Sequence, residues 1–260
     1  EDNITALKSF LGDSYDVRIR RFRIGGTGHE AAAVFVESLV KEDILLEFVI
    51  RPLMLWQPLS AEGQKIKISS QAIIDCLVSS EQTEEYKSFD KIIPAVLSGD
   101  TLLTIEGLDT GIIVSTENMT GRNIEEPKVE PSIRGPKVAF VENLKENTGL
   151  IRKRLKDPNL TFELWKVGRR SKTDVVIVFV KGIANEEFVR EARKRIGSID
   201  TDDGVSAGML VHYISDRPNS VFPLLQVSER PDTVVASLLD GRVAVIADGS
   251  PEIILLPATF

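Results

Sequence analysis

The chain has 260 residues, of which 42% are hydrophobic and 27% charged, and its formal net charge is −7. This composition is typical of a globular protein, and we find neither a signal peptide nor an apolar run long enough to cross a membrane. A lone Cys76 excludes an internal disulfide, and together with only His29 and His212 it cannot form a thiolate or imidazole cluster for zinc. We therefore expect no metal and no cofactor.

A glycine-rich stretch, 24–30 (IGGTGHE), follows the strand-like residues that end in RFRIGG (21–26) and precedes an apolar run at 31–36 (AAAVFV). Such a stretch resembles a phosphate-binding loop, which needs a helix N-terminus directly after it. Here an apolar run typical of a β-strand follows instead. The sequence therefore predicts two strands joined by a hairpin loop.

The next clear pattern is FDKIIPAVLSG (89–99), whose apolar residues have helical spacing. Asp90 is placed to cap the helix at its N-terminus, and Gly99 is placed to end it. Two short apolar runs follow, at 101–105 and 111–115, with an acidic residue and a glycine between them. They predict a β-hairpin directly after the helix.

The same order of elements recurs later in the chain. Four blocks of the chain match four later blocks in the same order. Block 21–26 matches 164–169 at an offset of 143 (164 minus 21), and 31–48 matches 175–192 at an offset of 144 (175 minus 31). Blocks 89–99 and 97–107 match 231–241 and 239–249 at an offset of 142 (239 minus 97). Short matches arise by chance, but four in the same order favour an internal duplication.

The duplication predicts an α/β (α+β) protein with two similar subdomains, each a mixed sheet with antiparallel hairpins flanked by helices. We expect an N-terminal subdomain at 5–126, a connector at 127–135 and a C-terminal subdomain at 136–260. Three prolines between residues 125 and 136 favour an extended connector. Two like lobes joined in this way favour a hinge, with a small-molecule cleft between the lobes.

Positive charge is concentrated between Leu150 and Ile196, where thirteen Lys and Arg face six Asp and Glu, leaving the window at +7 and the remainder at −14. Solvated helix faces are one explanation. Convergence on one surface that meets anionic lipid or an acidic partner is the other. The basic surface candidates are Arg152, Arg154, Arg193 and Arg195. Nucleic acid is disfavoured, because few aromatic residues interleave with these cations.

Several ordered motifs resemble the A-subunit family of bacterial spore germinant receptors, the GerA type. They are IRGP (133–136), NTGLIRKRL (147–155), the GR and KT pairs (168–169 and 172–173), IAN (183–185), SERPD (228–232), LLDGRVAVIADGSP (238–251) and the final P-x-x-F (257–260), with looser matches at 97–107 and 122–127. One departure is that His212 and Tyr213 stand where the family is expected to have an acidic pair.

The resemblance implies that family members continue into membrane-spanning segments beyond residue 260, and that this chain is the N-terminal soluble part. It implies a location at the spore inner membrane, on the cytoplasmic (spore core) side. The implied partners are a B-type integral membrane subunit, a C-type lipoprotein and other A subunits. A nutrient ligand such as an amino acid or sugar, and an anionic membrane surface, are further possibilities that the resemblance raises.

The polar residues that we consider for a ligand or an interface are Arg134, Gly135, Glu229, Arg230, Asp232 and Arg242. Structural roles are the alternative: Asp232 as a helix N-cap like Asp90, and Arg230 in an ion pair with Glu229. The first copy has Asp100 at the position of Arg242, so the fold does not require an arginine there. We therefore expect Arg242 to face a partner.

The function that we favour is a non-catalytic module that takes part in germinant sensing or in transmitting the signal. The alternative is an assembly module that oligomerises and has no ligand of its own. An enzyme ranks last, because only dispersed carboxylates are available to it; a cleft with two carboxylates of perturbed pKa would revive that hypothesis.

Overall fold

A computed structural model describes residues 2–57, 68–77, 83–117, 138–204, 206–215 and 225–258. The chain divides into two compact units, unit 1 (Glu1–Leu11 and Asp16–Thr120) and unit 2 (Gly12–Tyr15 and Gly121–Phe260). The expected connector, 127–135, lies outside the described residues. Among the described helices, none is both long and apolar enough to span a membrane.

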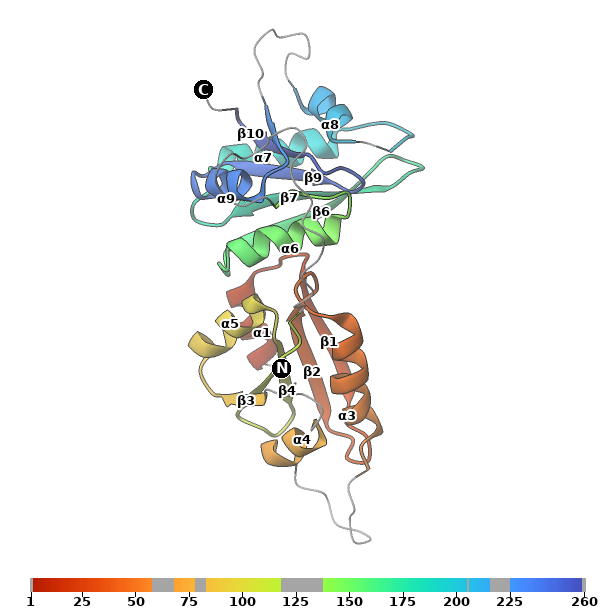
Figure 1. The fold of residues 1–260 in the computed structure, drawn as a ribbon, viewed down its shortest axis with the longest axis vertical. Coiled ribbons are helices and arrows are strands. Elements are labelled where there is room, and N and C mark those ends of the chain that lie inside the picture. Colours follow the sequence, from red (N-terminus) through yellow and green to blue (C-terminus); the bar gives the residue numbers. More distant parts are fainter. Residues whose placement is uncertain are drawn as a thin grey trace. The chain divides into compact units, whose positions relative to one another are not determined.

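Unit 1 contains a five-stranded sheet with strand order β1-β2-β4-β5-β3 and helices on both faces (Figure 1). Its elements are α1 (Asp2–Leu11), β1 (Val17–Arg23), β2 (Glu30–Val36), α2 (Glu42–Ile44), the π-helix η1 (Leu45–Ile50), α3 (Arg51–Leu55), α4 (Ser70–Cys76), β3 (Thr83–Tyr86), α5 (Phe89–Ser98), β4 (Thr101–Ile105) and β5 (Gly111–Val114).

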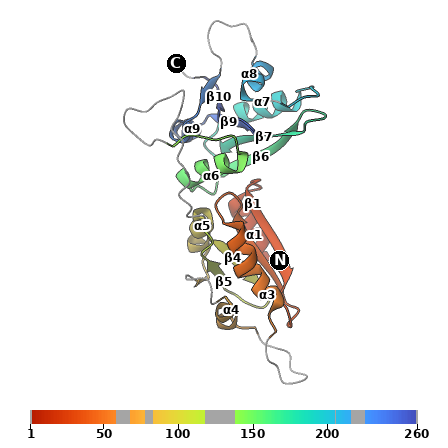
Figure 2. The same cartoon turned by 45° about the vertical axis from the view of Figure 1, so that its right-hand side comes forward.

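Unit 2 repeats this plan with strand order β6-β7-β9-β10-β8 (Figures 1 and 2). Its elements are α6 (Leu144–Arg154), β6 (Leu160–Val167), β7 (Thr173–Val180), α7 (Glu186–Gly197), α8 (Ala207–Ile214), β8 (Gln226–Ser228), α9 (Pro231–Leu239), β9 (Val243–Ala247) and β10 (Ile253–Leu256). The α/β prediction of two similar subdomains is confirmed, and every strand pair within the described residues is antiparallel.

The strand registers support the internal duplication. Val34 pairs with Leu102 in unit 1, and Val178 pairs with Ala244 in unit 2. These pairs are related by the same offsets, 144 (178 minus 34) and 142 (244 minus 102), that the sequence comparison gives. The two copies therefore match residue by residue in their central strands. Corresponding side chains of the two copies therefore point to the same face of their sheets, because a slip of one residue in the strand pairing would turn every side chain to the other face.

Successive side chains of a strand point to opposite sides, and in the central strands of each sheet both sides are buried. In unit 2, Val176 and Val178 pack against α6 and α9, whereas Val175 and Ile177 pack against α7 and α8. Unit 1 is layered in the same way, with α1 and α5 on one face and α3 and α4 on the other. This double burial explains why central strands such as β5 (GIIV) and β9 (VAVIA) read as continuous apolar runs.

The loops at 24–29 and 168–172 are hairpin loops, as the sequence predicts. A Cβ atom on Gly25 would lie 2.3 Å from the carbonyl oxygen of Met54, and one on Gly168 would lie 2.7 Å from that of Asp203. These glycines allow the hairpin to approach the neighbouring backbone closely. Their presence at matching positions of the two copies therefore has a packing reason, and nucleotide binding is not needed to explain it.

The predicted N-caps are wrong in both copies. The Oγ of Ser88 caps α5, accepting a hydrogen bond of 3.3 Å from the Asp90 backbone N–H. In α9 the N-cap position belongs to Arg230, which makes no side-chain cap bond, and Pro231 begins the helix. Asp90 and Asp232 each lie two positions further, in the first turn, where a carboxylate still interacts favourably with the helix dipole.

Candidate functional site

The expected ligand residues that the structure describes lie where β8 leads into α9. Arg230 Nη2 is 2.6 Å from Asp232 Oδ2, and Arg230 Nε is 3.2 Å from Asp232 Oδ1. The hydrogen bond from Arg230 is the main cause of the lowered pKa of Asp232. Arg230 thus forms an ion pair with Asp232. The Glu229 carbonyl accepts a 2.9 Å bond from the Phe140 N–H. Arg134 and Gly135 lie outside the described residues.

Arg242 does not face a partner. Only 6% of it is exposed, and its Nη1 donates to Gln226 Oε1 at 2.9 Å and to Ser237 Oγ at 3.1 Å. Burial lowers its pKa, although an arginine remains charged at any ordinary pH. The expectation of an interface role is therefore wrong, because Arg242 ties the start of β9 to α9 and β8.

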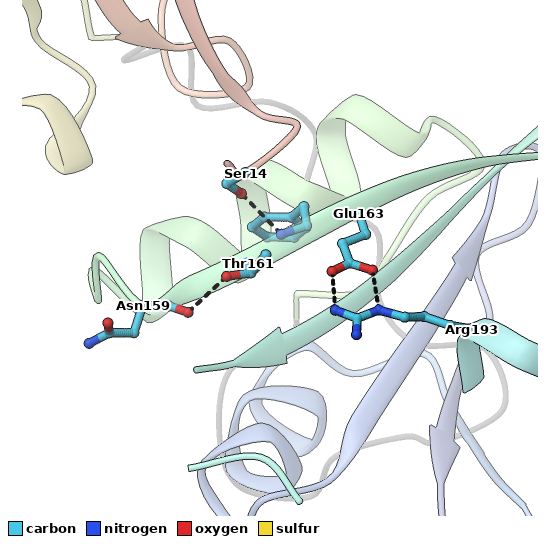
Figure 3. A network of polar contacts seen from close by, with 6 residues as sticks. Ser14, Asn159, Thr161, Glu163 and Arg193 are labelled. Atoms are coloured by element: carbon cyan, nitrogen blue, oxygen red, sulfur yellow. Dashed lines mark hydrogen bonds and ion pairs between the residues drawn. The ribbon is translucent and has the colours of Figure 1, made fainter. Parts of the chain in front are cut away.

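Arg152 is likewise not a surface residue. It is 1% exposed, and its guanidinium donates 3.0 Å bonds to the carbonyls of Asp157 and Leu160. Ser14 completes this cluster, because its Oγ accepts from the Phe162 N–H at 3.0 Å (Figure 3) and from Arg152 Nη2 at 3.4 Å. Arg152 therefore stabilises the end of α6 and the start of β6.

The remaining basic candidates do not form one patch. Arg154 is exposed on α6, whereas Arg193 and Arg195 belong to α7, and these two helices cover opposite faces of the sheet. Arg193 Nε is 2.9 Å from Glu163 Oε2 (Figure 3), and Arg195 Nε is 2.8 Å from Glu191 Oε1. The cations of the basic window are thus spread over two layers and partly neutralised, which does not support one surface for anionic lipid.

Helix α8 carries the departure from the expected family pattern. His212 and Tyr213 are both exposed, and Met209, one helical turn before Tyr213, is 39% exposed. These residues lie three and four positions apart and so share one helix face. The departure therefore changes a surface and leaves the core of unit 2 intact.

A groove that the sequence did not indicate lies in unit 1, over the face of the sheet that α1 and α5 cover. Its volume is about 620 Å³, and its apolar lining includes Leu7, Ala32, Ile92 and Leu102. Six charged residues at its rim balance one another, namely Arg21, Arg23, Lys87, Glu30, Glu106 and Asp109. A groove of this size, partly apolar and partly polar, is suited to binding and has no net charge to attract a particular ion.

Two pairs of opposite charges lie at the groove rim. Lys87 Nζ is 3.0 Å from Asp109 Oδ2, and this hydrogen bond lowers the pKa of Asp109. Arg23 Nη2 is 3.7 Å from Glu30 Oε1. A carboxylate with a lowered pKa stays ionised, whereas a general acid needs a raised one. No group of three possible metal ligands occurs in the described part of the chain.

The comparisons with known proteins agree with this two-unit fold. Residues 5–260 match the family described as Bacillus/Clostridium GerA spore germination protein. The chain is 33% identical over 259 residues to spore germination protein KA of Bacillus subtilis. This alignment covers 99% of this chain and 47% of the relative. It is 34% identical over 254 residues to GerLA of Bacillus cereus, covering 98% of this chain and 51% of the relative. The chain thus spans about half the length of these curated relatives.

A solved structure shares the fold. The crystal structure of the N-terminal domain of the A subunit of the Bacillus megaterium spore germinant receptor GerK3 has a TM-score of 0.74 and 30% sequence identity to this chain, covering 99% of this chain and 94% of that one. The chain belongs to the GerA family of spore germination proteins. The resemblance seen in the ordered motifs is thereby confirmed.

Proposed function

We propose that this chain is a non-catalytic module of a germinant receptor A subunit, which takes part in sensing a germinant or in transmitting its signal during spore germination. The observation that carries the proposal is the likeness of the whole chain, both units included, to the N-terminal domain of the GerK3 A subunit. The groove of unit 1, with its partly apolar and partly polar lining, supports a binding role.

In the longer protein we propose a location at the spore inner membrane, with this module on the core side. Its proposed partners are a B-type integral membrane subunit, a C-type lipoprotein and other A subunits. The ligand residues that remain in this proposal are Glu229, Arg230 and Asp232, with Arg134 and Gly135. An Arg–Asp pair that is about a fifth to a third exposed has the chemistry to recognise a zwitterion, because each member can exchange its partner for the opposite charge of an amino acid.

A nuclear magnetic resonance titration of the isotope-labelled chain tests this proposal, with amino acids, sugars and inorganic ions each taken to millimolar concentration. A sensing role predicts saturable shifts that centre on the backbone amides of 228–233. The variant Asp232→Asn, which removes one charge of the pair, should abolish these shifts for an amino acid. Asp13→Asn, which neutralises an exposed carboxylate elsewhere, is the matched control.

The same titration decides between sensing and the alternative, an assembly module with no ligand of its own. If no compound in the panel shifts any resonance, direct sensing by this module is excluded. Sedimentation of the chain over a range of concentrations then measures self-association. A stable oligomer would support assembly, whereas a strict monomer would leave signal transmission through other subunits as the role.

A further inference from the structure

The sheets of the two units differ at their edge strands. β1 and β3 are the edges of the unit 1 sheet, and β6 and β8 are the edges of the unit 2 sheet (Figure 1). An edge strand presents backbone N–H and C=O groups that no neighbouring strand of its own sheet can bond. Such an edge can take a further strand wherever no other segment bonds to these groups.

Both edges of the unit 2 sheet are bonded by other segments of that unit. At β6, the Tyr15 N–H donates to the Phe162 carbonyl at 2.8 Å, and the Phe162 N–H donates to the Ser14 Oγ at 3.0 Å. At the end of β8, the Glu229 carbonyl accepts a 2.9 Å bond from the Phe140 N–H. Unit 2 thus covers part of each edge with its own chain.

The β1 edge of unit 1 has open positions. Backbone groups point alternately to either side along an antiparallel strand, and the Asp16 carbonyl and Ile24 N–H, which flank β1, both bond toward β2. The backbone groups of Val17, Ile19 and Arg23 therefore point away from β2. None of these outward groups takes part in a hydrogen bond within the described part of the chain.

The β3 edge is open as well. Glu84 pairs with Ile113 at the same register as Gln226 with Leu255, since both offsets are 142 (226 minus 84 and 255 minus 113). Outward groups alternate in β3 as they do in β8, so those of Thr83 and Glu85 point away from β5. Among the residues that the structure describes, no hydrogen bond reaches these groups either.

The two open edges carry opposite charge. β1 (VRIRRFR) contains four arginines and no acidic residue, whereas β3 (TEEY) contains two glutamates and no basic residue. The edges of unit 2 are neutral, because β6 has one glutamate and one lysine, and β8 has no charged residue. The unit that leaves its edges open is therefore also the unit that charges them, with one sign on each edge.

Charged side chains on an edge keep identical edges of two copies apart, because equal charges that face each other repel. They therefore disfavour a contact of β1 with β1, or of β3 with β3. They do not disfavour a contact of β1 with β3, in which arginine side chains face glutamates. Arg20, Glu84 and Glu85 are all exposed and so available for such a contact.

We propose that β1 of one chain pairs with β3 of a second copy, so that the unit 1 sheets join edge to edge. β1 and β3 run in the same direction, because the four strand pairs that connect them are all antiparallel. A second copy whose sheet faces continue those of the first thus adds β3 parallel to β1. Arg20 and Glu85 then lie on the face that α3 and α4 cover, and Arg23 and Glu84 lie on the other.

A contact between two different edges is head-to-tail, so each copy in the assembly offers one edge to each neighbour. Association therefore continues beyond a dimer and ends in a closed ring or in a filament. It should weaken with added salt, because salt screens exposed opposite charges. Self-association of A subunits is part of the proposed function, and the edge contact rests on that part alone.

Small-angle X-ray scattering of the 260-residue chain tests the assembly, with the protein taken from micromolar to millimolar concentration in low salt. The mean mass should rise beyond that of a dimer and return toward that of a monomer in high salt. A chain that stays monomeric at millimolar concentration overturns the proposal. A mass that levels off at a dimer also overturns it, because a head-to-tail contact of these edges does not stop at two copies.

Two charge-reversed chains test which edges meet. One carries Arg20→Glu with Arg23→Glu in β1, and the other carries Glu84→Lys with Glu85→Lys in β3. Each chain alone should associate with a Kd at least about tenfold higher than the parent, because like charges then face each other. An equal mixture should restore assembly, because the acidic β1 of one chain meets the basic β3 of the other. Unfolded variants could not give this recovery, and a mixture that stays monomeric overturns the proposal.

The matched control is Arg154→Glu with Arg170→Glu, which changes the net charge by the same amount as the β1 variant. Both residues are exposed in unit 2, away from the proposed contact. The control chain should assemble as the parent does. An equal loss of assembly in the control would show that net charge alone drives association, and would overturn the proposal.

Hydrogen exchange locates the contact. The N–H groups of Ile19 and Glu85 should exchange at least about tenfold more slowly in a concentrated sample than in a dilute one, because they then donate hydrogen bonds. Protection that is independent of concentration would place a segment of the same chain over the edge and overturn the proposal. Germinant sensing is measured separately at 228–233, where both reversed chains should respond as the parent does.

Discussion

The guanidinium carbon of Arg152 lies over the ring of Phe162, 5.0 Å from its centroid. The same guanidinium bonds to the carbonyls of Asp157 and Leu160, so one cation joins α6, the following loop and the edge strand β6. Gly12–Tyr15 reaches this cluster too, because the Tyr15 N–H donates to the Phe162 carbonyl at 2.8 Å. The most basic stretch of the sequence therefore contains a core residue.

The variant Arg152→Ala should lower the free energy of unfolding by about 3 kcal/mol, because buried carbonyls lose charged donors and a cavity remains. Urea denaturation followed by circular dichroism measures this. Arg154→Ala, two residues away and exposed, is the matched control and should leave the transition unchanged. Equal midpoints for the two variants would contradict a core role for Arg152.

Arg242 should also prove structural. Arg242→Ala is expected to cost about 2 to 3 kcal/mol of unfolding free energy, because the Gln226 and Ser237 oxygens lose a charged donor in a buried site. A double-mutant cycle with Ser237→Ala should give a coupling energy of about 1 kcal/mol. Additive losses would show that the 3.1 Å contact contributes nothing.

The Arg230–Asp232 pair predicts a pH-dependent contribution to stability. The folded-state pKa of Asp232 lies below its unfolded value, so the contribution is complete above the normal range of an aspartate, about 4. It is lost as the pH falls through the lowered pKa. We expect Asp232→Asn to be less stable than the parent at pH 7 by less than about 1 kcal/mol, since the pair is partly exposed.

Urea titrations of parent and Asp232→Asn at several pH values between 2 and 7 measure this contribution. The two stabilities should converge at the acid end. At pH 7 the variant Asp13→Asn, at an exposed site, should match the parent. A gap between parent and Asp232→Asn that stays constant with pH would show that the carboxylate charge is irrelevant.

Alanine substitutions at Gly168 and Gly182 distinguish the cost of a steric clash from the cost of backbone strain. Both have positive φ, +91° and +81°, but an added Cβ would meet the Asp203 carbonyl at 2.7 Å only at Gly168, and nothing within 4 Å at Gly182. Gly182→Ala should therefore cost about 1 kcal/mol and Gly168→Ala about 3 kcal/mol or more. Thermal denaturation of the two variants compares them, and equal losses would exclude the steric explanation.

Much of the fold followed from local patterns. The helix and hairpin of 89–115 and their repeat at 231–256 were predicted because helical and strand spacings are properties of neighbouring residues. The repeat offsets also agree with the observed strand registers. A shift of one strand against its neighbour would move its apolar side chains away from the core, so both copies keep the same register. The predicted N-caps, Asp90 and Asp232, lie two positions after the true ones. Ser88 caps α5, and Pro231 begins α9 directly after its N-cap residue.

What the sequence alone determined is therefore the duplicated α/β order, the hairpin loops and the family motifs. Only the tertiary structure decided that Arg152 and Arg242 are buried and that Arg230 pairs with Asp232. It also placed the basic helices α6 and α7 on opposite faces of one sheet. The groove of unit 1 is likewise a feature of the tertiary structure, because its lining comes from α1, α5 and the strands of the unit 1 sheet. The physical reason is that charge and polarity belong to single residues, whereas burial and partnership depend on which distant segments the sheet brings together.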